Sequence, residues 1–160
     1  MSIEASIDLR IIHAISGDVI SPTKTLEILA SSGWSLINQN GYARYLTIGG
    51  GDMFDWQSSK METELFMKIL KAKEEEGGLV GVGISWQNTE IDGEILLYCE
   101  KEMLEKKINT SMSFCLGDRK MLVDDVRLKI TDVNWYLTKL LPAFNQGDTI
   151  VEYFTYEEHI

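Results

Sequence analysis

Residues 79–101 read LVGVGISWQNTEIDGEILLYCEK, and this stretch decides the expected fold. Two runs rich in aliphatic and aromatic side chains, Leu79–Gln87 and Glu94–Lys101, stand on either side of EIDG, whose Asp92-Gly93 is a turn dipeptide. Tight turns join neighbouring strands in the antiparallel sense. The stretch therefore predicts a β-hairpin.

Further strands are expected on both sides of this hairpin. Upstream, Trp34–Gln39 and Tyr42–Ile48 flank Asn40-Gly41, which indicates a two-residue type I′ turn and would set Leu36 opposite Tyr45. Downstream, strands are expected at Ile108–Leu116, Met121–Ile130 and Thr149–Tyr156.

Helices are indicated by their end signals. Ser21-Pro22 pairs an N-cap residue with proline at the first helical position, and Gly33 supplies the stop. A second helix is expected to start near Ser59, with Glu62 in capping-box spacing, and to close at Gly77-Gly78.

A third helix is expected from about Asp132 towards Phe144, where Pro142 should end or kink it. Helices before and after a block of hairpin-joined strands predict an α+β fold. We expect a single domain over residues 1–160, with a mainly antiparallel twisted sheet of about five to seven strands and three helices packed largely on one face. The residues expected to be largely buried are Trp34, Leu36, Tyr45, Leu65, Ile69, Val82, Ile84, Leu96, Tyr98, Phe114, Leu137 and Leu140.

Composition narrows the classes of function. The 160 residues carry 15 basic and 25 acidic side chains, a net charge of −10 that disfavours direct binding to nucleic acid, since such binding depends on Lys and Arg. No apolar run is long enough for a membrane span, and the N-terminal residues lack the pattern of an export signal. A cytoplasmic location is expected, and the oligomeric state stays open.

Signals for chemistry are few. Cys99 and Cys115 lie 16 residues apart in apolar stretches and are expected to be reduced thiols, while His13 and His159 form no zinc-binding pattern. A catalytic Cys–His pair assembled in space is an alternative that the sequence leaves open. The prediction is a protein that is not an enzyme, with no catalytic residues, no metal and no cofactor.

The glycine clusters match nucleotide-binding loops poorly. Gly49, Gly50 and Gly51 are followed by Asp52 and not by the Lys-Ser/Thr of a P-loop. Gly81 and Gly83 precede a segment that reads as strand, where a helix is required to hold pyrophosphate. These glycines are expected where other parts of the chain come close.

Carboxylates are the functional group in surplus. Asp52 and Asp55 bracket two large apolar residues, and Trp56 follows directly. Glu90, Asp92 and Glu94 alternate through the hairpin. Carboxylates steer a basic partner, and aromatic anchors supply binding energy. The residues predicted to bind a partner are therefore Asp52, Asp55, Trp56, Glu90, Asp92 and Glu94.

The segment Gly33–Gln57, GWSLINQNGYARYLTIGGGDMFDWQ, resembles bacterial immunity proteins of polymorphic-toxin and contact-dependent growth-inhibition systems. The shared features are a Gly-Trp opening, a short hairpin, and a strand leading to Asp-x-x-Asp-Trp. The resemblance implies a small cytoplasmic protein without catalysis that binds one cognate toxin domain. A basic, nuclease-type toxin is the expected partner, because Lys and Arg line a nuclease cleft.

Two alternatives come from other classes of function. One is a small enzyme or ligand-binding domain with a pocket near residues 49–56. The other is an acidic adaptor that binds a protein or mimics nucleic acid.

Overall fold

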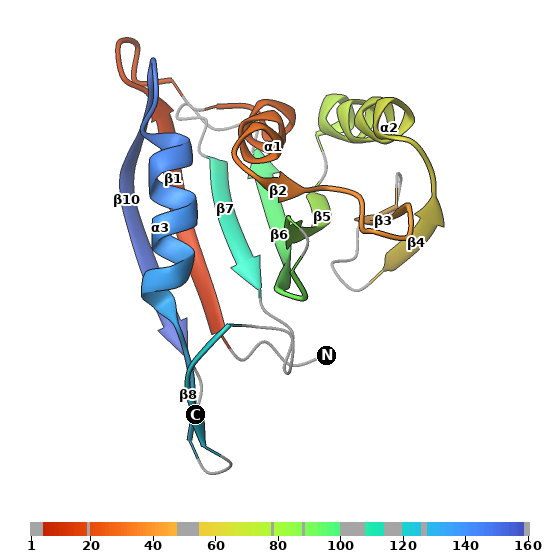
Figure 1. Ribbon diagram of the computed structural model, residues 1–160. Coiled ribbons are helices and arrows are strands. Elements are labelled where there is room, and N and C mark those ends of the chain that lie inside the picture. The colour runs from red at the N-terminus through yellow and green to blue at the C-terminus, as the bar shows by residue number, and fades with distance from the viewer. Residues whose placement is uncertain are drawn as a thin grey trace.

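The computed structural model describes residues 5–18, 20–47, 55–77, 79–87, 89–99, 108–113, 120–125 and 128–158. Within them the chain forms three helices and ten strands, which confirms the α+β class (Figure 1). The helices are α1 (Pro22–Ser31), α2 (Thr63–Glu76) and α3 (Val133–Phe144). The strands are β1 (Ala5–His13), β2 (Trp34–Ser35), β3 (Tyr42–Leu46), β4 (Trp56–Lys60), β5 (Val80–Trp86), β6 (Asp92–Cys99), β7 (Ile108–Ser113), β8 (Met121–Asp125), β9 (Leu128–Thr131) and β10 (Thr149–Glu158).

The main sheet runs in the order β10-β1-β7-β6-β5-β3-β4, with the short β2 also paired to β5. All of these pairs are antiparallel, and the β5–β6 hairpin predicted from residues 79–101 is confirmed. The strands β8 and β9 form a separate two-stranded sheet. In this order, β1 lies between β10 and β7 although it is distant from both in the sequence.

The helices cover one face of the main sheet. Figure 1 shows α3 in front of β1 and β10, α1 above β6 and β7, and α2 at the upper right beside β5. Helix residues at 0–2% exposure join the strands in one core: Leu26, Leu29, Phe66, Leu70, Tyr136, Leu140 and Phe144. No described helix is long and apolar enough to cross a bilayer.

The predicted helix ends are confirmed at several positions. Ser21 is the N-cap of α1, and its Oγ accepts a hydrogen bond from Lys24 N at 3.2 Å. Asp132 caps α3 by accepting from Trp135 N at 3.1 Å. Gly77 closes α2 in the left-handed region with φ of 80°, where glycine carries no steric penalty.

The predicted start of the second helix is wrong. Residues 56–60 form β4, in which Ser59 pairs with Ala43 of β3, and α2 begins only at Thr63 with Glu62 as its N-cap. The expected burial of Leu65 is also wrong, since it is 53% exposed. The helix buries Phe66 and Leu70 instead. Because successive helical residues point about 100° apart, Leu65 does not point in the same direction as Phe66.

The predicted hairpin around Asn40-Gly41 is only partly correct. Its first half is the two-residue β2, which pairs with β5, and only a bridge between Ile37 and Ala43 links it to β3. Gly41 donates its N–H to Asn38 O at 3.0 Å and has φ of 81°, whereas Asn40 keeps a negative φ. The turn is therefore not type I′, and the register is shifted by one residue, so Leu36 does not pair with Tyr45.

Two further expectations need correction. Met121–Ile130 is two short strands, β8 and β9, instead of one. Asp92-Gly93 begins β6, with Asp92 opposite Ser85, so the turn lies before it. The third helix ends at Phe144 as expected, with Pro142 inside its last turn.

The expected core is confirmed at Trp34, Leu36, Tyr45, Val82, Ile84 and Leu140. Ile69, Leu96 and Leu137 are half-buried. The side chains of Tyr98 and Cys99, together with residues Asp52, Phe114 and Cys115, lie outside the described residues.

Candidate functional site

Two glycines of β5 leave room for side chains of the neighbouring strand β3. Val80, Val82 and Ile84 are buried in the core, so Gly81 and Gly83 face away from the helices. A β-carbon built on Gly81 would lie 2.6 Å from Leu46 Cδ1, and one on Gly83 would lie 3.0 Å from Arg44 Cβ. Close packing explains both glycines without a nucleotide.

The side chains on this face of the sheet are arranged around Arg44. Its Nη2 and Nε donate to the same oxygen of Glu94, at 2.8 and 3.2 Å. Its guanidinium carbon lies 5.2 Å from the ring centroid of Trp56, a cation–π distance. The Glu94 side chain is 11% exposed and that of Arg44 40%, so the pair stays reachable from solvent through the arginine.

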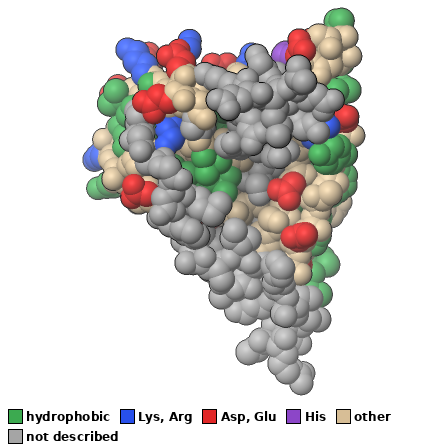
Figure 2. Space-filling model, turned by 180° about the vertical axis from the view of Figure 1, so that it is seen from behind, with side chains coloured by type: hydrophobic (Ala, Val, Ile, Leu, Met, Phe, Trp, Pro, Cys, Tyr) green, Lys and Arg blue, Asp and Glu red, His purple; other side chains and the backbone are tan. Residues whose placement is uncertain are grey.

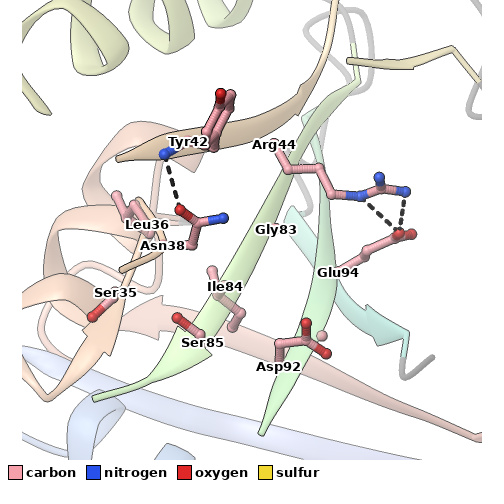
Figure 3. A pocket seen from close by; sticks show the side chains of 11 residues that line it. Ser35, Leu36, Asn38, Tyr42, Arg44, Gly83, Ile84, Ser85, Asp92 and Glu94 are labelled. Carbon is pink, nitrogen blue, oxygen red and sulfur yellow. Dashed lines mark hydrogen bonds and ion pairs between the residues drawn. The ribbon is translucent and has the colours of Figure 1, made fainter. Parts of the chain in front are cut away.

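A pocket of about 110 Å³ opens beside this arginine, and we call it the Arg44 pocket (Figure 3). Residues from β2 and the turn after it, from β3, β5 and β6 form its walls. The lining residues are Ser35, Leu36, Asn38, Tyr42, Arg44, Gly83, Ile84, Ser85, Asp92, Gly93 and Glu94.

The structure brings together three of the residues predicted to bind a partner. Asp92 and Glu94 line the Arg44 pocket, and Trp56 joins them through Arg44. Asp55 is exposed beside Trp56, and its Oδ2 accepts from Thr47 Oγ1 at 3.0 Å. Glu90 is exposed in the β5–β6 turn and does not line the pocket.

Sequence reasoning missed Arg44 and the polar side chains of Ser35, Asn38 and Ser85. One signal was present, since Arg44 is the charged residue within the strand YARYL. Its position opposite Gly83 depends on how β3 sits beside β5, which the sequence pattern does not reveal.

Acidic side chains are spread over the back of the molecule. Figure 2 shows Asp and Glu at several separate places among neutral side chains, and in the described part of that face they form no single large patch. The described residues also contain no group of three or more His, Cys, Asp or Glu placed to hold a metal ion. The local charge of the Arg44 pocket is therefore a better guide to a binding partner than the net charge of the chain.

Comparison with protein-family models, with curated proteins and with solved structures finds no significant match for this chain.

Proposed function

We propose that this chain is an immunity protein that binds a basic, nuclease-type toxin domain and neutralises it without catalysis. The proposed contact surface comprises Asp52, Asp55, Trp56, Glu90, Asp92 and Glu94. The observation that carries the proposal is the contact of Arg44 with both Glu94 and Trp56, beside a pocket that Asp92 also lines.

This arrangement has the chemistry that a basic partner requires. The net charge of −10 attracts a cationic domain over a distance, and exposed Asp55 and Glu90 add local negative charge. Trp56 offers an aromatic surface of the type enriched in binding hot spots. Carboxylates that enter a nuclease cleft take the place of substrate phosphates, and the cleft is then closed to nucleic acid.

Co-expression tests the proposal. The immunity function requires a large toxin gene immediately upstream, and the probe is the C-terminal domain that such a gene encodes, produced in bacterial cells with and without this chain. We expect that domain to stop growth alone, and growth to recover when this chain is present. A harmless upstream domain, or one that this chain fails to bind, would contradict the immunity function.

Charge reversal tests the surface. Asp55→Lys with Glu90→Lys should slow association with the toxin domain by about tenfold or more and remove protection, because steering depends on local charge. Both side chains are exposed, so the melting temperature should stay close to wild type.

A matched control separates this surface from overall charge. Asp18→Lys with Glu157→Lys changes the net charge equally at exposed sites, with Glu157 on the opposite edge strand β10. This control should protect cells like wild type. Equal loss in both double variants would mean that net charge, and not this surface, steers the toxin domain.

A further inference from the structure

We propose that the Arg44 pocket binds one cationic side chain, an arginine or a lysine, which the partner inserts beside Asp92. This inference rests on the proposed function and names the group that the partner would contribute. The sequence indicated the acidic residues Asp92 and Glu94, but not the pocket or its polar side chains Ser35, Asn38 and Ser85.

The size of the pocket favours a side-chain head group. Pockets for whole small molecules measure about 300–1,000 Å³. The Arg44 pocket holds about 110 Å³, which suits a guanidinium or an ammonium with its last methylenes. The small volume also argues against a complete metabolite as the occupant.

The charge of the lining favours a cation. Arg44 is the basic residue among the lining side chains, whereas Asp92 and Glu94 are acidic, so the lining is net negative. Arg44 already donates twice to Glu94 and lies over the ring of Trp56. An anion would have to compete with Glu94 for this guanidinium, whereas a cation leaves the pair intact.

Hydrogen-bond acceptors and an aromatic ring complete the site. Figure 3 shows the hydroxyls of Ser35 and Ser85 and the carboxylate of Asp92 around the lower part of the pocket. Tyr42 lies at its other end and is 45% exposed. An entering arginine carries several donors for these oxygens, and its alkyl stem or guanidinium can lie against the tyrosine ring.

The position of Asp92 sets the side of the sheet from which a cationic side chain would enter the pocket. Asp92 is the first residue of β6 and pairs with Ser85, so the backbone of both strands holds the carboxylate and the hydroxyl on one side of the sheet. Gly83 and Gly93 add no side chain to the lining. A long, unbranched cationic side chain reaches such a recess without movement of the strands.

Titration with arginine methyl ester, which carries a guanidinium and no carboxylate, tests the site in the free protein. Backbone amide NMR signals of pocket residues such as Gly83, Ser85 and Gly93 should shift saturably with the probe. Asp92→Asn should weaken binding by about tenfold or more, since it removes a charge-assisted partner. Glu157→Gln removes the same charge on the distant edge strand β10 and should bind like wild type.

A second variant covers the case in which Asp92→Asn does not fold. Ser85→Leu fills the pocket from β5 without altering its charge, and it should abolish the saturable shifts. The proposal is overturned if the shifts do not saturate, if Asp92→Asn and Glu157→Gln bind equally, or if acetate binds there in place of the cation.

The outcomes distinguish this proposal from the immunity function. If Asp92→Asn and Ser85→Leu still neutralise the upstream toxin domain while the probe fails to bind, the pocket assignment falls and the immunity function stands. If the probe binds as expected and the upstream domain is not recognised, the immunity function falls and the pocket assignment stands.

Discussion

Gly81 lies where the buried side chain of Leu46 crosses from β3 onto β5. A β-carbon there would meet Leu46 Cδ1 at 2.6 Å and the Trp56 ring at 3.1 Å, both under an ordinary van der Waals contact. At Gly83 the nearest atom is Arg44 Cβ, at 3.0 Å. The two glycines therefore differ in how much the neighbouring side chains must move.

Alanine substitutions should reveal this difference. Gly81→Ala should destabilise the protein by about 1–3 kcal/mol, because Leu46 is buried and has little room to move. Gly83→Ala should cost less, since its nearest contact, at 3.0 Å, is longer than the 2.6 Å contact at Gly81. Urea denaturation measures both values. A larger loss for Gly83→Ala would show that Leu46 gives way more easily than Arg44.

At the level of single residues, the sequence predicts acidic side chains but not their partners. Asp92 and Glu94 stand out in the sequence because they alternate with Glu90 around the predicted turn, and in β6 that alternation puts both on one face. Arg44 lies 50 residues from Glu94 in the sequence, and the pairing of β5 with both β3 and β6 brings the two together. No local pattern encodes that distance.

Among the elements, helix ends are predicted where they depend on neighbouring residues. Ser21 and Pro22 act within one turn of α1, and the expected start is confirmed. The start of α2 was misplaced because Ser59 is held by its pairing with Ala43 in another strand. Sheet pairing overrode a capping-box signal of correct spacing.

The actual N-cap of α2 leaves stability to be gained. Glu62 has the extended conformation of an N-cap (φ −86°, ψ 157°), yet its side chain makes no capping hydrogen bond. Aspartate is a preferred N-cap residue, so Glu62→Asp should stabilise the protein by about 1 kcal/mol, or roughly 2–4 °C in melting temperature. The charge beside the helix N-terminus is preserved.

The N-cap of α1 allows the opposite test, in which a side-chain cap is removed. Ser21→Ala removes the acceptor for Lys24 N and should destabilise the protein by about 1 kcal/mol. Glu74 of α2 also accepts a hydrogen bond from Thr23 N, at 3.0 Å, so the end of α1 keeps one side-chain cap.

If Glu62→Asp lowered the melting temperature, the aspartate side chain at position 62 would not reach the backbone amides at the N-terminus of α2.

For the whole molecule, the strand order was the least predictable feature. The strand β1 alternates clearly, with Ala5, Ile7, Leu9 and Ile11 at 0–2% exposure, yet no strand was predicted there. Even with β1 assigned, its place between β10 and β7 requires contacts across most of the chain. The fold class follows from element types, whereas the order follows from long-range packing.

The strand order leaves two edges of different character. At one end, β4 is five residues long and mostly polar, with Gln57, Ser58 and Lys60 exposed. At the other end, β10 is ten residues long, with Tyr153 49% and Phe154 43% exposed. A long edge strand with exposed apolar side chains invites pairing with another chain, and charged side chains on it oppose such pairing.

Glu157 is the side chain of β10 best placed to oppose self-association. Glu152 pairs with Arg10 at 3.0 Å, and Glu158 accepts from Thr131 N, whereas Glu157 is exposed near the end of the strand. Glu157→Val should therefore raise concentration-dependent self-association above that of wild type, as seen by sedimentation velocity. Ser58→Val places the same side chain on the short polar edge β4 and should cause a much smaller increase. If both variants sediment like wild type at high protein concentration, the β10 edge is protected by something other than this charge.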